Sequence, residues 1–253
     1  MPIFKNEDFN MYYDELGSGV PIVFIHPPGM GRKVFLFQSY LQEHFRVIFP
    51  DLSGHGDSSV GTYLDSSISS YANEIKFLLD HLQISKAVIC GYSAGGIIAQ
   101  EFALIFPERT TATILVSSYP KVQSLILKEE HLIGMYLVKK FPRFLAKCIA
   151  SSHTNRRDIA KVLFDHMMKA NKELWFQYYE KTLTYSCVER LTQLKSPLLL
   201  VYGSNDFTNQ HIRSYRDIPH QLKVIEKVSH QVLTKKWEIF NRLVTDFITK
   251  TVQ

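Results

Sequence analysis

The chain has 253 residues, of which 45% are hydrophobic and 21% are charged, and its net charge is +5. This composition suits one large domain with a sizeable core and excludes a disordered or low-complexity chain. The three cysteines are few, odd in number and far apart, so we expect neither a disulfide framework nor a zinc site. The absence of a signal-like start or a bilayer-length apolar run predicts a cytoplasmic protein without integral membrane association.

Short apolar runs that end in turn residues predict the strands of a sheet. The expected strands are Pro21–His26, Phe45–Asp51, Lys86–Ser93, Ala112–Ser118, Pro197–Gly203 and Leu222–Val228. Runs this apolar are typical of strands that are covered on both faces. They therefore favour an α/β fold class, with a mostly parallel central sheet and helices on both of its faces.

Helical spacing of apolar residues separates several of these strands. The expected helices are Ile68–Leu82, Ala94–Phe106 and a terminal helix from Trp237 to Ile248. Asp65, Ser66 and Ser67 are candidate N-caps of the first helix, and Pro107 ends the second. Strands and helices thus alternate along most of the chain, as they do in a parallel α/β sheet.

Residues 119–190 interrupt this alternation, because no strand pattern is apparent there. The segment carries 13 Lys and Arg against 7 Asp and Glu, and is rich in helical apolar patterns. We predict an inserted helical lid over these residues, between a first core part (1–118) and a second core part (191–253). No glycine-rich phosphate loop or aromatic-interleaved basic platform occurs, so we expect no nucleic acid partner.

The sequence GYSAGG surrounds Ser93 with residues that have almost no side chain. The serine follows an apolar strand and precedes a helix, so the chain must turn sharply at that point. Gly91 and Gly95 suit such a turn, because backbone approaches backbone there, and Gly96 helps the helix pack on its strand. G-x-S-x-G in this context predicts a nucleophile elbow with Ser93 at its apex.

A serine hydroxyl needs a base to take its proton and an acid to orient that base. In a strand–elbow–helix fold the expected chain order is serine, acid, histidine. Asp206 lies just beyond the strand that ends at Gly203, and His230 lies just beyond the last strand. We therefore predict a catalytic triad of Ser93, Asp206 and His230. His55 precedes the acid and is expected to be structural.

With these residues in place, the sequence resembles the α/β-hydrolase superfamily over nearly its whole length. The resemblance rests on five ordered motifs: FIHPPGMG, DLSGHGDSS, GYSAGG, YGSND and VSH. The sequence most resembles the small members of this superfamily that have a lid and need no cofactor or metal. Among them are esterases, haloperoxidase-like enzymes and carbon–carbon bond hydrolases. A serine at the elbow implies acyl transfer through a covalent acyl-enzyme.

The segment His26-Pro27-Pro28-Gly29-Met30 departs from the pattern of this superfamily. The family's second oxyanion donor, a backbone N–H, falls on Pro28, and proline has no N–H. The Ala94 N–H, directly after the nucleophile, is unaffected. We predict that Gly29 or Met30 supplies the missing donor, since glycine lets the backbone turn inward.

The lid is rich in large apolar residues, which favours a small, largely apolar ester as substrate. We expect His26, Pro28, Tyr92 and Trp175 to line the substrate pocket. The basic excess of the lid leaves a second hypothesis open, in which residues 139–147 or 155–157 bind an acidic substrate, carrier or lipid. The alternatives are therefore a carbon–carbon hydrolase or lyase on an acidic substrate, a perhydrolase, or a slow-turnover ligand receptor.

Overall fold

A computed structural model describes residues 3–5, 10–60 and 67–252. Within them the strands form one sheet in the order β1-β2-β4-β3-β5-β6-β7-β8. β2 pairs antiparallel with β1 and β4, and the pairs from β4 to β8 are parallel. The strands are β1 (Ile3–Lys5), β2 (Asn10–Leu16), β3 (Pro21–Ile25), β4 (Arg46–Pro50), β5 (Ala87–Tyr92), β6 (Thr110–Val116), β7 (Leu198–Gly203) and β8 (Gln221–Ile225).

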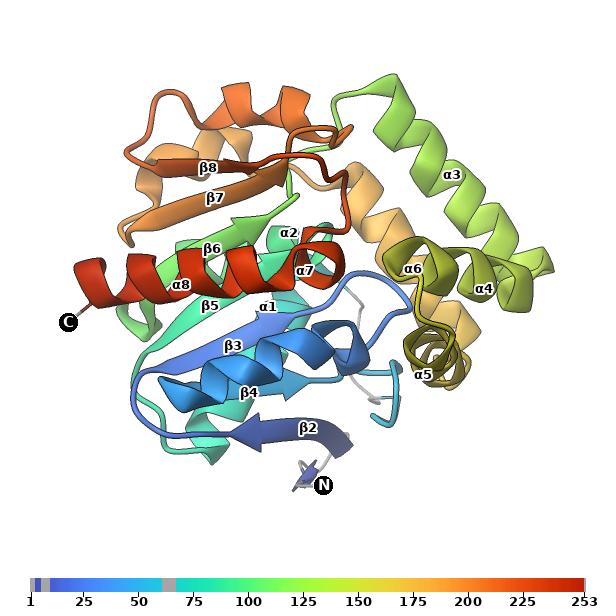
Figure 1. Ribbon diagram of the computed structural model, residues 1–253, viewed down its shortest axis with the longest axis horizontal. Helices are drawn as coiled ribbons and strands as arrows, with labels where there is room; N and C mark the ends of the chain where they lie inside the picture. The colour runs from blue at the N-terminus through green and yellow to red at the C-terminus, as the bar shows by residue number, and fades with distance from the viewer. Residues whose placement is uncertain (1–2, 6–9, 61–66, 253) are drawn as a thin grey trace.

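The sheet is covered on both faces, as its apolar strands predict. Successive residues of β3 point to opposite sides: Val23 and Ile25 join one buried cluster, and Ile22 and Phe24 join the other. The first cluster includes residues of α1 (Ile68–His81) and α2 (Gly95–Ile105), and the second includes residues of η1 (Arg32–Glu43) and α8 (Trp237–Thr251). Figure 1 shows α8 and the helix after β3 in front of the sheet.

Two features of the sheet differ from the expectation. β1 and β2 were not predicted from the sequence. In the first part of β2, buried residues alternate with exposed or half-buried ones, as is typical of an antiparallel strand near the edge of a sheet. β8 was expected to be covered on both faces, yet its first four residues are exposed. The reason is its position, because β8 is the last strand in the sheet order and has a neighbour on one side only.

The N-terminus of α1 agrees with one of its candidate caps. The Ser67 hydroxyl accepts a hydrogen bond from the Ser70 N–H. Asp65 and Ser66 lie outside the described residues. The terminal helix is also present as predicted, with Phe240, Val244 and Phe247 buried against the sheet.

Four helices follow β6 and stand at one end of the sheet (Figure 1). They are α3 (Leu125–Lys140), α4 (Pro142–His153), α5 (Arg157–Met167) and α6 (Lys172–Thr184). The two ends of this segment meet, because Lys121 and Ser186 form an isolated bridge and the Cys187 N–H donates to the Pro120 carbonyl. We call the segment between these contacts the lid, and its boundaries at residues 119 and 190 stay a prediction.

Across the described ranges, no helix combines the length and the hydropathy that crossing a bilayer requires. The helix α3, which is the longest in the lid at 16 residues, carries five charged side chains. The remaining short elements are η2 (Pro107–Arg109), η3 (Val188–Gln193), η4 (Asn209–Tyr215) and α7 (Val232–Lys235).

Candidate active site

The turn at Ser93 has the strained geometry that its glycines predict. Ser93 has a φ of 52°, in the left-handed region, and its N–H donates to the Val116 carbonyl at the end of β6. A Cβ on Gly91 would lie 2.4 Å from the Gly96 Cα, and one on Gly95 would lie 2.3 Å from the Ile25 carbonyl oxygen. Only glycine fits at these two positions, so the small residues allow the elbow to form.

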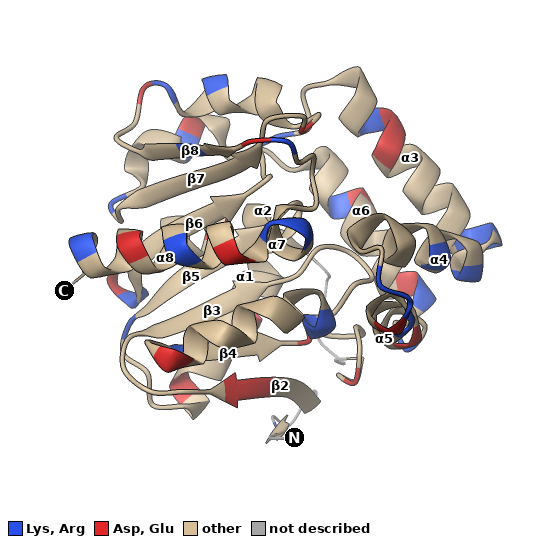
Figure 2. Ribbon diagram, viewed as in Figure 1, with Lys and Arg blue, Asp and Glu red and all other residues tan. Residues whose placement is uncertain are grey.

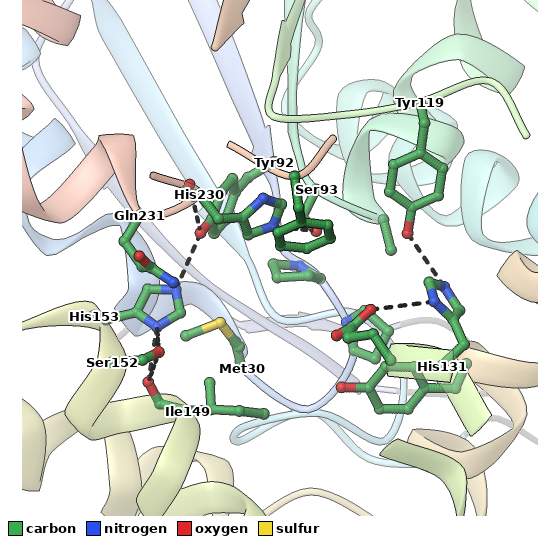
Figure 3. A pocket seen from close by; sticks show the side chains of 16 residues that line it. Met30, Tyr92, Ser93, Tyr119, His131, Ile149, Ser152, His153, His230 and Gln231 are labelled. Carbon is green, nitrogen blue, oxygen red and sulfur yellow. Dashed lines mark hydrogen bonds and ion pairs between the residues drawn. The ribbon is translucent and has the colours of Figure 1, made fainter. Parts of the chain in front are cut away.

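The structure brings Ser93, His230 and Asp206 together from three separate loops, and Figure 3 shows the first two of them. The Ser93 Oγ lies 2.8 Å from His230 Nε2, and His230 Nδ1 lies 3.1 Å from Asp206 Oδ1. Each loop follows a parallel strand, β5, β8 or β7, and parallel strands present their carboxyl ends at the same edge of the sheet. The arrangement is thus a hydroxyl, an imidazole and a carboxylate in hydrogen-bonded series.

The surroundings of His230 and Asp206 hold this series in place. Burial raises the pKa of Asp206, but the charge and hydrogen bond of His230 outweigh it and lower that pKa below its ordinary value. The Phe207 ring stacks on the His230 ring with 4.9 Å between the ring centroids. The Tyr92 ring is tilted relative to the His230 ring, with 5.5 Å between the centroids. An ionised carboxylate on Nδ1 favours the tautomer whose Nε2 can accept the proton of Ser93.

The proline-rich turn before η1 has a defined geometry. The Met30 N–H donates to the Pro27 carbonyl at 3.3 Å, and Gly29 has a φ of 77°. Proline at the second position and a glycine of positive φ at the third make this a type II turn. The Met30 N–H, one of the two candidates for the second oxyanion donor, is therefore used in the hydrogen bond of the turn. The choice between Gly29 and Met30 stays a prediction.

A cavity of about 150 Å³ opens at Ser93 between the sheet edge and the lid. Two of the four predicted pocket residues, Pro28 and Tyr92, line it, together with Met30 and Ala94. His26 is not among the lining residues, because its ring is buried beneath the turn and bonds to Leu52 N and Pro27 O. Trp175 packs against Gly29 instead, where a Cβ would lie 2.1 Å from its ring.

Several polar residues of the cavity wall were not predicted as site residues, among them Tyr119, Glu130, His131, Ser152, His153 and Gln231. The His131 Nε2 lies 3.2 Å from the Tyr119 hydroxyl, and the His153 Nε2 lies 3.1 Å from the Tyr92 hydroxyl (Figure 3). Burial lowers the pKa of His153 to about 4, so this imidazole is neutral at pH 7. Glu130, His131 and His153 lie on helices of the lid, where the sequence does not indicate which face of the helix turns toward the site.

The basic residues of the lid do not reach this cavity. Among the described residues that line it there is no Lys or Arg, and the single carboxylate is Glu130. Arg156 pairs with Asp158 at the surface, and the Lys139 ammonium lies over the Phe176 ring. Figure 2 shows Lys and Arg gathered where α3 meets α4, away from the sheet edge.

A second cluster of charged residues lies between the core and α5. The Arg32 guanidinium pairs with Asp51 and with Asp57, and His166 Nε2 lies 2.9 Å from Asp51 Oδ1. Although Asp51, Asp57 and His166 are close enough to hold a metal ion, Arg32 already supplies a positive charge to both carboxylates. We therefore interpret this cluster as an ion-pair network.

The loop that contains Asp51 is tight and buried. Gly54 and Gly56 both have positive φ values, and a Cβ on Gly56 would lie within 2.2 Å of the Asp51 carboxylate. His55 is fully buried, and burial lowers its pKa to about 3. It faces His26 at 5.1 Å and is not among the described residues that line the cavity at Ser93.

A family model described as "alpha/beta hydrolase fold" matches residues 20–185. The chain belongs to this family, which confirms the resemblance and the fold class expected from the sequence. Its relatives include 3-oxoadipate enol-lactonase 2 of Acinetobacter baylyi, 25% identical over 96% of this chain and 97% of that one. A 2-hydroxy-6-oxononadienedioate/2-hydroxy-6-oxononatrienedioate hydrolase of Pseudomonas putida is 26% identical over 96% and 93%.

Solved structures show the same fold at low identity. A carboxylesterase of Nitrososphaera gargenis superposes with a TM-score of 0.86, at 22% identity over 99% of both chains. An esterase of Thermogutta terrifontis gives 0.83, at 23% identity over 96% of this chain and 94% of that one. The prediction of a hydrolase agrees with these relatives, which are themselves hydrolases and esterases.

Proposed function

We propose that the chain is a serine hydrolase that cleaves a neutral, largely apolar ester through a covalent acyl-enzyme. The observation that carries this proposal is the 2.8 Å contact between the Ser93 hydroxyl and His230 Nε2 at the wall of a cavity. A hydroxyl that can lose its proton to a neighbouring imidazole, beside space for a carbonyl group, is what acyl transfer requires.

In the proposed reaction Ser93 Oγ attacks the ester carbonyl while His230 takes its proton. His230 then gives that proton to the departing alcohol, and a water molecule, activated by the same imidazole, releases the acid from Ser93. Asp206 stays ionised and stabilises the imidazolium formed in each step. The lowered pKa of Asp206 supports this role.

The negative charge on the attacked oxygen needs backbone donors. The Ala94 N–H, at the start of α2, is the first donor in this proposal. For the second we favour Gly29 over Met30, because the Met30 N–H already donates to the Pro27 carbonyl. The type II turn would thus compensate for the N–H that Pro28 lacks.

The walls of the cavity favour a small neutral substrate. A volume of about 150 Å³ suits a group of about the size of benzene. A carboxylate buried there would meet Glu130 and no described Lys or Arg side chain, and an unpaired buried charge is costly. This lining argues against the acidic substrate of the carbon–carbon hydrolase alternative, although one relative's name gives a dioate.

The test measures hydrolysis of 4-nitrophenyl acetate and butyrate together with labelling by a fluorophosphonate. We expect turnover of both esters and a single adduct, which peptide mass spectrometry maps to Ser93. The Ser93→Ala variant, folded by circular dichroism, should show neither. A folded wild-type protein that hydrolyses no ester and takes no label would refute the proposal and favour a ligand receptor.

A further inference from the structure

A second hollow lies on the lid, between α3 and α4. It has a volume of about 550 Å³, and its walls are almost entirely apolar. Three large side chains of α3 line it although they are mostly exposed: Leu125 at 78%, Ile126 at 64% and Ile133 at 55%. Contiguous exposed apolar surface of this kind marks a binding groove more often than a chance arrangement.

The groove follows from the helical spacing of α3. Leu125, Glu129 and Ile133 are four residues apart and form one stripe, and Ile126, Glu130 and Gly134 form the next. Gly134 lets α3 approach α6 closely, since a Cβ there would lie 2.9 Å from the Tyr179 ring. The Tyr179 side chain can therefore form part of the groove wall.

The groove adjoins the Ser93 cavity, because the two spaces share part of their lining. Glu130, Ile149 and Tyr179 line both spaces, so they form the neck between them. Figure 3 shows Ile149 and His131 on the side of the cavity that faces the lid, across from Ser93. A substrate whose carbonyl lies at Ser93 could thus extend an apolar arm through the neck into the groove.

The neck carries one negative charge. Besides burial, the charge of Glu130 raises the pKa values of Tyr92, Tyr119 and Tyr179, three tyrosines around the cavity. Glu130 lines the cavity as well as the groove, so its carboxylate faces both spaces. Glu129, one residue earlier on α3, lines the groove but not the Ser93 cavity.

We propose that the α3–α4 groove binds an uncharged apolar arm of the ester, and that Glu130 at its neck rejects substrates with a carboxylate on that arm. The occupant is an alkyl or acyl chain of the substrate, because three residues line both the groove and the cavity in which we place the reacting carbonyl. This inference rests on the proposed ester hydrolysis at Ser93 and adds the class of substrate.

The first test compares 4-nitrophenyl esters with acyl chains of four to ten carbons, and acetate esters of alcohols of the same lengths. Each buried methylene contributes up to about fourfold to kcat/KM. We expect kcat/KM to rise at least tenfold from four to eight carbons in one of the two series. The series that rises identifies whether the acyl or the alcohol part occupies the groove.

A matched pair of variants locates the effect. Ile133→Trp fills the groove, whereas Leu132→Trp places the same bulk on the neighbouring residue, which does not line it. Both residues are exposed, at 55% and 40%, so both variants should fold. We expect the ratio of eight-carbon to four-carbon kcat/KM to fall about tenfold in the first variant and to stay within twofold in the second.

The second test concerns Glu130. The mono-4-nitrophenyl ester of adipic acid and 4-nitrophenyl hexanoate have equal chains and differ by one terminal carboxylate. We expect wild type to prefer the hexanoate by at least 30-fold, and Glu130→Gln to reduce this preference about fivefold. Glu129→Gln should reduce it less, and 0.5 M salt should weaken it in wild type.

The outcomes separate this inference from the proposed function. Hydrolysis of short esters with a flat chain-length profile would overturn the groove and leave the proposed function intact. Equal effects of Ile133→Trp and Leu132→Trp would show that the groove does not bind the apolar arm. Equal effects of Glu130→Gln and Glu129→Gln would show that Glu130 does not reject the carboxylate. If no ester is hydrolysed by a folded protein, both the inference and the proposed function are wrong.

Discussion

The described residues include two Asp–His pairs with similar distances and different surroundings. His230 lies 3.1 Å from Asp206, and His166 lies 2.9 Å from Asp51. The His230 imidazole is 13% exposed, and its other nitrogen contacts the Ser93 hydroxyl at the cavity. The His166 imidazole is 4% exposed and bonds to a carboxylate that also holds the Arg32 guanidinium.

This comparison teaches that an Asp–His pair gains its role from the other groups around it. Asp206 has no Lys or Arg partner among the described ion pairs, so its charge is available to the imidazolium that forms during a reaction. The Asp51 charge is already balanced by Arg32, and the Lys169–Asp57 pair of 2.6 Å joins the same cluster to the lid. We therefore propose proton transfer as the role of the first pair, and attachment of the lid to the core as the role of the second.

The largest expected effect comes from removing the nucleophile beside the first pair. We expect Ser93→Ala to lower kcat for 4-nitrophenyl butyrate by about 10⁶-fold, the magnitude seen when a triad nucleophile is removed. Its melting temperature should change little, because the hydroxyl supports no other described side chain. Kinetics and differential scanning calorimetry check both parts, and residual activity above 1% would contradict the assignment of Ser93.

Neutralising the acid of the first pair should be nearly as damaging. We expect Asp206→Asn to lower kcat by about 10⁴-fold, since the amide would favour the wrong tautomer of His230. Substrate binding should change little, so KM should stay within a few-fold of wild type. A loss of less than tenfold in steady-state kinetics would show that Asp206 is not the partner of His230 in turnover.

Neutralising the acid of the second pair should damage stability instead. Asp51→Asn leaves the buried Arg32 short of a partner, which costs about 3–5 kcal/mol of unfolding free energy. Urea denaturation measures this loss, with Asp57→Asn as a milder control because Asp57 is 20% exposed. Activity of the folded fraction should fall far less than in Asp206→Asn, and the opposite pattern would reverse the two roles.

The buried histidines near the second pair should make stability depend on pH. Burial lowers the pKa of His55 to about 3, below the unfolded value of about 6.5. The unfolded state therefore binds the proton first, and stability present above pH 6.5 is lost as the pH falls toward the folded pKa. Each such group contributes a slope of up to about 1.4 kcal/mol per pH unit.

The measurement is urea denaturation at pH 7, 6 and 5 for wild type and His55→Asn. We expect the variant to be less stable at pH 7 but to lose less stability on acidification, because one proton-binding group is gone. His44→Asn, at the surface end of η1, is the control and should keep the wild-type slope. Parallel slopes for wild type and His55→Asn would contradict a neutral buried His55.

The smallest effect is expected where a charged pair faces solvent. Arg156 and Asp158 are 65% and 62% exposed, and such pairs contribute about 0–1 kcal/mol. We expect Arg156→Ala with Arg157→Ala to change stability by less than about 1 kcal/mol and kcat/KM for neutral esters by less than twofold. A large rise in KM for an anionic ester in this variant would restore the hypothesis of an acidic substrate bound by the lid.

Much of the core was predictable because its signals are local. Ser93, Asp206 and His230 each follow an apolar strand, and parallel strands end at a common edge, so strand order alone brings the three side chains near one another. The glycines around Ser93 predict the elbow for the same kind of reason, since a positive φ and close backbone contacts are properties of a few consecutive residues.

The lid and the periphery depended on packing between distant segments. A helix can turn any residue toward the site, so nothing in the sequence near Glu130, His131 or His153 indicated that they line the cavity. The same holds for Trp175, which packs behind Gly29, and for β8, which is exposed because it lies at the edge. Sequence periodicity determines which residues share a face of an element, but the partner that covers that face is known only once the chain has folded.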